Sequence, residues 1–172
     1  AELAGDADYA ERPPDARSTL LRGLLVDRPH ATAGPALAPV LEVFRAVAEA
    51  LPRYGAAAFG PYIISMSRSA ADALAVLVLA RAAGCLDAGG EVPLDVAPLF
   101  ETVADLQAAP DVLRSLFAEP AYRAHLRRRG DVQWVMLGYS DSAKDGGLVA
   151  SRWALQRAQL VLTELAGEAG IA

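Results

Sequence analysis

The chain has 172 residues, 53% of them hydrophobic, so it is long enough to bury one good-sized core and too apolar for a disordered protein. A formal net charge of −5 argues against a nucleic-acid-binding surface, which is usually basic. The single cysteine, Cys85, excludes a disulfide framework; the polar, acidic start and the shortness of the apolar runs predict a cytoplasmic protein that does not enter a membrane.

Residues 1–60 are predicted to form a helical lead-in segment. Apolar residues at helical spacing predict one helix over 15–26 and a second over 36–51, with Pro39 in the first turn of the second helix. A Pro- and Gly-containing turn over 28–35 is expected to join the two helices.

Residues 61–172 have a different texture, in which short apolar runs alternate with helical patterns. Strands are predicted over 62–66, 92–101 and 132–139, and the last of these is apolar enough to be buried on both faces. The predicted helices cover 70–83, 103–109, 110–118, 121–129 and 148–168. Ser69 with Asp72, and Thr102 with Asp105, have the spacing of N-terminal capping pairs.

Three units in which a strand precedes a helix predict an α/β fold with parallel strands. This alternation of strands and helices is compatible with two architectures, a doubly wound sheet or part of a (β/α)-barrel of the TIM type. A barrel needs about eight such units, so this chain alone is expected to supply only part of one. The chain also stops where a further strand is expected to begin.

Ligands of parallel α/β folds gather at the carboxyl ends of the strands. Arg68 follows the first predicted strand, Glu101 ends the second, and a predicted loop over 140–147 follows the third with Asp141 and Lys144. If the second and third strands are neighbours, Glu101 and Asp141 meet, and two carboxylates suit Mg²⁺ or Mn²⁺. Alternatively, Glu101 lies next to a helix cap and Asp141 caps the last helix, and the spacing leaves both interpretations open.

Lys144 is the only lysine in the chain, and the other 15 of its 16 lysine and arginine residues are arginines. Its place in a loop that ends in two glycines, before a helix, favours a role in binding an anion. The alternative is a solvated lysine paired with Asp141 or Asp145, which adds little to stability. For Arg68 an anion-binding role and a structural ion pair are both open.

Three segments together resemble phosphoenolpyruvate carboxylase: "FGPYIISMSRSAADALAV", "APLFETVADLQAAPDVLRSLF" and "VMLGYSDSAKDGGLVASRWAL". The "GYSDSAKD" motif is highly specific, and "YAERPPDARSTLLRGLLVDRPH" is similar to the helical stretch that leads into that family's central region. The resemblance covers almost the whole chain.

The resemblance implies a large (β/α)-barrel lyase, normally a homotetramer, that adds bicarbonate to phosphoenolpyruvate with Mg²⁺ or Mn²⁺ and yields oxaloacetate and phosphate. Bicarbonate attacks the phosphoryl group to give carboxyphosphate and a metal-held enolate, which then captures CO₂. Glu101 and Asp141 are implied as the metal ligands, Lys144 lies beside the bicarbonate or phosphate oxygens, and Arg68 is a candidate for holding an anion.

The family's glycine-rich loop with its histidine and arginine, and its other catalytic histidine and arginines, are absent from this sequence. We therefore expect these 172 residues to be inactive as a carboxylase when isolated. The alternatives are an incomplete piece with only a vestigial metal site, and another metal-dependent barrel that handles phosphoenolpyruvate or pyruvate.

Overall fold

The computed structural model describes residues 1–26 and 34–172, which form two compact units. One unit contains Ala1–Gly60 and Leu74–Leu94, and the other contains Pro61–Ala73 and Asp95–Ala172. The expected division into domains at residue 60 stays a prediction, because compactness alone does not define a folding domain.

The first unit begins with the two predicted helices, and both are confirmed. They are α1 (Pro14–Val26) and α2 (Ala38–Tyr54), and the 3₁₀ turns around them are η1 (Glu2–Ala4), η2 (Tyr9–Glu11) and η3 (Ala56–Ala58). A proline occupies the start of α2 as expected, and Leu41 and Phe44 are buried along one side of it. Most of the turn predicted over 28–35 lies outside the described residues.

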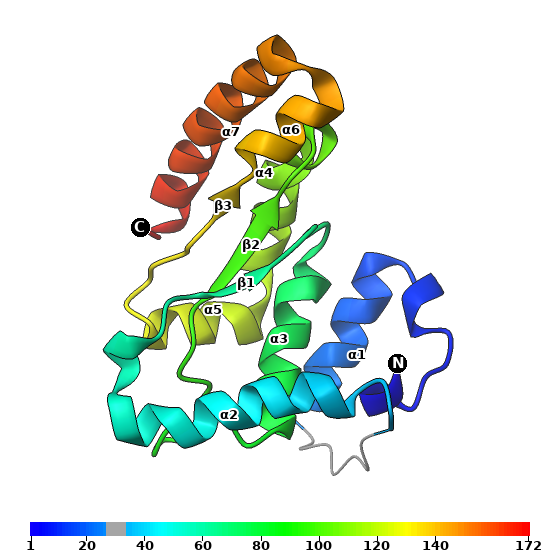
Figure 1. Cartoon of the computed structure of the whole chain (residues 1–172), viewed down its shortest axis with the longest axis vertical. Coiled ribbons are helices and arrows are strands. Elements are labelled where there is room, and N and C mark those ends of the chain that lie inside the picture. Colours follow the sequence, from blue (N-terminus) through cyan, green and yellow to red (C-terminus); the bar gives the residue numbers. More distant parts are fainter. Residues whose placement is uncertain (27–33) are drawn as a thin grey trace. The chain divides into compact units, whose positions relative to one another are not determined.

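The second unit contains a parallel sheet of three strands in the order β1-β2-β3 (Figure 1). The strands are β1 (Tyr62–Ile64), β2 (Val96–Phe100) and β3 (Met136–Leu137). Tyr62 is in register with Val96, and Phe100 is in register with Leu137. The predicted α/β class with parallel strands is therefore confirmed, although each strand is shorter than its apolar run.

Helices follow each strand. They are α3 (Ala70–Ala82), α4 (Val103–Ala118), α5 (Pro120–Arg128), α6 (Tyr139–Gly146) and α7 (Leu148–Ala169). The prediction of separate helices over 103–109 and 110–118 is wrong, because α4 runs through Pro110 without a break. Burial of Ala109, Val112 and Leu113 around the proline stabilises the helix and offsets the missing N–H donor. In the parts of the chain that the structure describes, no helix has the length and hydropathy to cross a bilayer.

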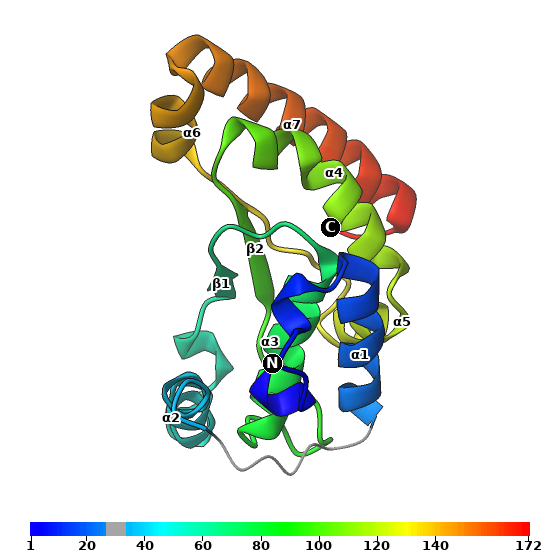
Figure 2. The ribbon, with the colours of Figure 1, turned by 90° about the vertical axis from the view of Figure 1, so that its right-hand side faces the viewer.

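One face of the third predicted strand is covered by helices and the other is exposed. Leu113 of α4 and Leu162 of α7 line a pocket together with Val135, and both views show α4 and α7 side by side (Figure 2). The neighbouring residues of the third predicted strand, Trp134 and Met136, point the opposite way and are 51% and 43% exposed. The expectation that this strand is buried on both faces is therefore wrong for the described residues, because the side chains on its second face are exposed.

The prediction of a loop over 140–147 is also wrong, because Tyr139–Gly146 forms α6. Serine, aspartate and glycine favour turns when only local signals act. Here the Ser142 hydroxyl is buried, donates to the Gly138 carbonyl oxygen, and lies 2.7 Å from the Ser151 hydroxyl of α7. Packing between α6 and α7 therefore supports a helix that the local composition does not favour.

The last residue of the chain lies beside the segment that leads into β3. The Ala172 N–H donates to the Asp131 carbonyl oxygen at 2.8 Å, and the Gln133 N–H donates to the Ala172 carbonyl oxygen at 2.9 Å. This pair of bonds is the pattern of a parallel bridge.

Candidate functional site

Glu101 and Asp141 follow adjacent parallel strands at the same edge of the sheet. Glu101 comes directly after β2, and Asp141 lies in the first turn of α6, which follows β3. The Gly138 N–H donates to the Phe100 carbonyl oxygen at 2.8 Å and so extends the pairing of the two strands. A Cβ atom on Gly138 would lie only 2.9 Å from Glu101 Cα. The segments that carry the two carboxylates therefore touch at their backbones.

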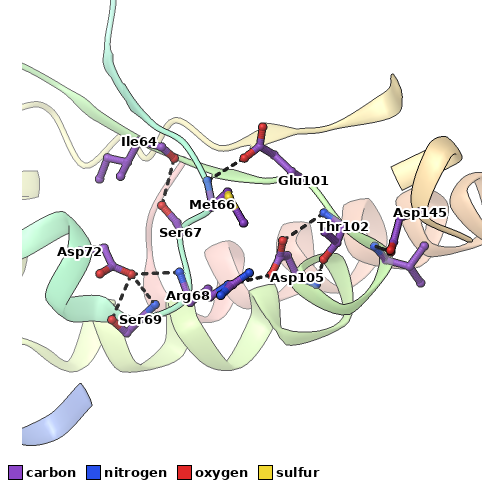
Figure 3. Close-up of polar contacts among 11 residues, drawn as sticks. Ile64, Met66, Ser67, Arg68, Ser69, Asp72, Glu101, Thr102, Asp105 and Asp145 are labelled. Carbon is purple, nitrogen blue, oxygen red and sulfur yellow. Dashed lines mark hydrogen bonds and ion pairs between the residues drawn. The ribbon is translucent and has the colours of Figure 1, made fainter. Parts of the chain in front are cut away.

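The Glu101 side chain is held by the turn after β1. Its Oε2 atom accepts a hydrogen bond of 2.8 Å from the Met66 backbone N–H (Figure 3). Met66 has a φ of 52°, a left-handed conformation that is uncommon for a residue with a side chain. Strained backbone of this kind often occurs at functional sites, and here it aims an N–H at the carboxylate.

Asp141 and Lys144 form an exposed ion pair, with 3.0 Å between the Asp141 Oδ1 and Lys144 Nζ atoms. The Lys144 side chain is 76% exposed, so this pair adds little to stability. Lys144 lies in the last turn of α6, where a cation complements the helix dipole, and not in the predicted loop before a helix. The pairing with Asp141 that the sequence left as an alternative is therefore present.

Arg68 pairs with Asp105 at the start of α4, with 3.6 Å between Nε and Oδ1 (Figure 3). Asp105 is buried and forms the predicted capping box with Thr102, which is confirmed. Burial is the largest influence on the Asp105 carboxyl and raises its pKa. Hydrogen bonds from Thr102 and the charge of Arg68 act against burial, and together they hold the pKa below its usual value. The structural ion pair proposed for Arg68 is present.

This carboxyl predicts a pH-dependent contribution to the stability of α4. Because the pKa of Asp105 is lower in the folded state, its stabilising effect is complete above the unfolded value of 3.8 and is lost as the pH falls through the folded value. At pH 7 we expect Asp105→Asn to lower the local opening free energy by about 0.5–1 kcal/mol. Hydrogen exchange of the first-turn amides of α4 measures this difference, which should shrink as the pH falls below 3.8 and the Asp105 carboxyl takes up a proton. A difference that persists at low pH would show that charge is not involved.

The capping pair predicted at the start of α3 is present in an altered form. The Asp72 carboxylate accepts hydrogen bonds from the backbone N–H groups of Arg68 and Ser69 and from the Ser69 hydroxyl (Figure 3). The turn that follows β1 is therefore fixed at both ends, by Glu101 at Met66 and by Asp72 at Ser69.

Asp145 makes a contact that sequence reasoning missed. Its Oδ2 atom accepts a hydrogen bond of 3.0 Å from the backbone N–H of Val103, the first residue of α4 (Figure 3). A Cβ atom on Gly146 would lie 2.7 Å from the Val103 Cγ2 atom. The residues are more than forty positions apart, so no local pattern signals the contact. Locally, Asp145 precedes two glycines, a pattern that predicts a loop and not this contact.

The donor atoms near this edge limit what kind of ion it suits. Within the residues that the structure describes, no group of three or more His, Cys, Asp or Glu side chains could hold a metal. A pair of carboxylates with the remaining positions left to water or substrate is the arrangement that Mg²⁺ usually has in proteins. This donor set fits Mg²⁺ or Mn²⁺ better than zinc, whose sites in proteins are mostly built from cysteine and histidine.

A family model described as phosphoenolpyruvate carboxylase matches residues 2–172. The chain is 49% identical over 179 residues to the phosphoenolpyruvate carboxylase of Xanthomonas campestris pv. campestris (strain 8004), a match that covers 99% of this chain and 19% of the relative. It is 44% identical to that of Mycobacterium avium (strain 104), with 95% of this chain and 18% of the relative covered. The chain thus spans about a fifth of the length of these curated relatives.

Proposed function

The chain belongs to the phosphoenolpyruvate carboxylase family, and we propose that the complete polypeptide containing it carboxylates phosphoenolpyruvate with bicarbonate. The products are oxaloacetate and inorganic phosphate, which makes the enzyme a carbon–carbon lyase. The observation that carries this proposal is the position of Glu101 and Asp141 after the adjacent parallel strands β2 and β3. In a parallel α/β fold this edge of the sheet is where substrates bind.

In this proposal Glu101 and Asp141 hold Mg²⁺ or Mn²⁺. The bound ion offsets negative charge that develops on substrate oxygens. The Met66 N–H occupies Glu101 Oε2 and leaves the other carboxylate oxygen for the ion. A hydrogen bond to one oxygen of a ligating carboxylate orients it, as neighbouring groups commonly do at metal sites.

Lys144 and Arg68 are proposed to hold the anionic substrates. The reaction brings phosphate and carboxylate groups together, so fixed cations lower the energy of the crowded charges. Lys144 is paired to Asp141 through an exposed contact, and its flexible side chain can exchange this partner for a substrate oxygen at little cost. Arg68 contacts Asp105 through its Nε atom, and its side chain is 64% exposed. The guanidinium group therefore has other N–H donors available to an anion.

The proposed chemistry has two steps. A bicarbonate oxygen attacks the phosphorus of phosphoenolpyruvate and displaces the enolate of pyruvate, which leaves carboxyphosphate. Carboxyphosphate then releases CO₂ and phosphate, and the enolate carbon bonds to the CO₂ to give oxaloacetate. The role of this chain is to place carboxylates and cations around the reacting oxygens, since positioning and charge stabilisation supply most of the catalysis in phosphoryl transfer.

We also propose that the sheet is part of a (β/α)-barrel of the TIM type. The sequential order β1-β2-β3 and the cover of α4 and α7 on one face are expected of a barrel wall. The opposite face carries Ile63, Trp134 and Met136, all exposed, and such a face is filled by the other strands in a closed barrel. The bridge of Ala172 to 131–133 favours a fourth parallel strand beside β3.

The remaining features of the proposal follow the family resemblance. They are a homotetramer of the complete polypeptide and a location in the cytoplasm. The competing proposals are a vestigial metal site in an inactive piece and a different metal-dependent barrel enzyme acting on phosphoenolpyruvate or pyruvate. The exposed pair of Asp141 with Lys144 is the observation that favours the vestigial site, because it occupies one of the proposed metal ligands.

An assay that couples oxaloacetate formation to NADH oxidation tests the function. We expect the complete polypeptide to form oxaloacetate with Mg²⁺ or Mn²⁺ and bicarbonate, and residues 1–172 alone to show no turnover above background. The reason is that the isolated segment carries only some of the cationic side chains that the reaction needs. Metal-dependent turnover by the segment would contradict the expectation for the piece, and an inactive complete polypeptide would contradict the proposed function.

A further inference from the structure

Helix α6 is docked on the turn that joins β2 to α4. The N–H groups in the first turn of a helix lack acceptors within that helix. At Val103, the first residue of α4, the acceptor is the Asp145 carboxylate of α6, at 3.0 Å. A carboxylate at this position also faces the positive end of the α4 dipole. The contact therefore joins two helices through a charged hydrogen bond to the backbone.

Close packing holds α6 at both of its ends. At the beginning, the Gly138 backbone lies against Glu101, where a Cβ atom would come within 2.9 Å of the Glu101 Cα atom. At the end, Gly146 lies against the Val103 side chain, where a Cβ atom would come within 2.7 Å. Asp141 lies between these two contacts. Its distance from Glu101 is therefore set by how α6 sits on the Glu101–Val103 turn.

We infer that Asp145 is a positioning residue that fixes Asp141 relative to Glu101. The inference rests on the proposed function, in which those two carboxylates share a divalent ion. Asp145 is exposed, so its hydrogen bond contributes little to global stability. Its effect is geometric: without it the C-terminal end of α6 loses its polar anchor on α4, and the two proposed ligands are no longer held at one separation.

The experiment titrates Mn²⁺ into the complete polypeptide and follows free Mn²⁺ by electron paramagnetic resonance. We expect Asp145→Ala to raise the dissociation constant about 10- to 100-fold, as losses of groups that orient metal ligands do. Asp145→Asn should stay within about threefold of wild type, because an amide oxygen still accepts the Val103 hydrogen bond. Tyr122→Phe is the stability control: it removes a partly buried hydrogen bond to Gln133, away from α6, and should leave Mn²⁺ binding unchanged.

Two results with the Asp145 variants would overturn the inference. One is Asp145→Ala binding Mn²⁺ as wild type does; the other is Asp145→Asn binding as weakly as Asp145→Ala, which would mean that charge and not the hydrogen bond matters. Glu101→Gln separates this failure from that of the proposed function. If Glu101→Gln weakens binding while Asp145→Ala does not, only the positioning role fails. If Glu101→Gln binds as wild type does, the proposed metal pair fails and the inference fails with it.

Discussion

Replacing Asp141 with asparagine in the complete polypeptide is expected to lower kcat/KM for phosphoenolpyruvate about a thousandfold. A metal ion contributes several kcal/mol of charge stabilisation in reactions of this kind, and each 1.36 kcal/mol corresponds to a factor of ten in rate. Asparagine keeps the size of the side chain but removes the negative charge that the ion needs. Initial rates in the coupled oxaloacetate assay, measured across a range of Mn²⁺ concentrations, provide the measurement.

The matched control for Asp141→Asn is Asp111→Asn, which makes the same chemical change on an exposed residue of α4. Asp111 forms an ion pair with the neighbouring Arg114, and its side chain is 85% exposed. Its replacement should leave kcat/KM within about twofold of wild type, as expected for a surface substitution. If Asp141→Asn behaves like Asp111→Asn, Asp141 is not a metal ligand and the exposed pair with Lys144 is its whole role.

The long helices could be predicted from the sequence because their signals are local. The apolar spacing that produces α1, α2 and α7 lies within each segment. The capping box of Thr102 and Asp105 likewise needs only residues three positions apart. The parallel direction of the three strands follows from their alternation with helices, which is also a pattern along the chain, whereas their order β1-β2-β3 comes from the structure.

The features that could not be predicted depend on partners distant in the chain. The helix α6 is stabilised by the contact of Ser142 with Ser151 and by the hydrogen bond of Asp145 to Val103, and neither has a local signature. The apolar run over 132–139 predicts burial but does not say which protein segment covers it. Met66 adopts a positive φ, a conformation that nothing in "YIISMS" indicates.

The location of the candidate residues was predicted, but their contacts were predicted only in part. Glu101 and Asp141 lie at one edge of the sheet, as expected from the carboxyl ends of parallel strands. The pairing of Asp141 with Lys144 was one of the alternatives that the sequence offered. The hydrogen bond from the Met66 N–H to Glu101 and the helical setting of Asp141 have no signature in residue spacing. Residue type and position in the topology are visible in a sequence, whereas side-chain direction depends on packing.

Gly138→Ala is expected to separate β2 from β3 and to disturb both proposed metal ligands. The φ of Gly138 is −81°, which alanine adopts freely, so the substitution carries no conformational penalty of its own. The added Cβ atom would lie 2.9 Å from Glu101 Cα and 3.3 Å from the carbonyl oxygens of Phe100 and Glu101. These are backbone atoms, so the strand itself must move, and overpacking of this kind costs about 1–3 kcal/mol.

Hydrogen exchange at the residue 138 amide measures this cost, because that N–H bonds to the Phe100 carbonyl oxygen. The loss of 1–3 kcal/mol corresponds to exchange roughly 5- to 150-fold faster. Gly167→Ala is the control: it makes the same substitution within α7, where no atom beyond its chain neighbours and the adjacent helix backbone lies within 4 Å of the new Cβ. Alanine there should stabilise the helix by about 0.5–1 kcal/mol. Gly138→Ala should also weaken Mn²⁺ binding, since Glu101 moves with the strand. Unchanged exchange and unchanged Mn²⁺ binding together would mean that the contact of Gly138 with Glu101 does not hold the two segments in place.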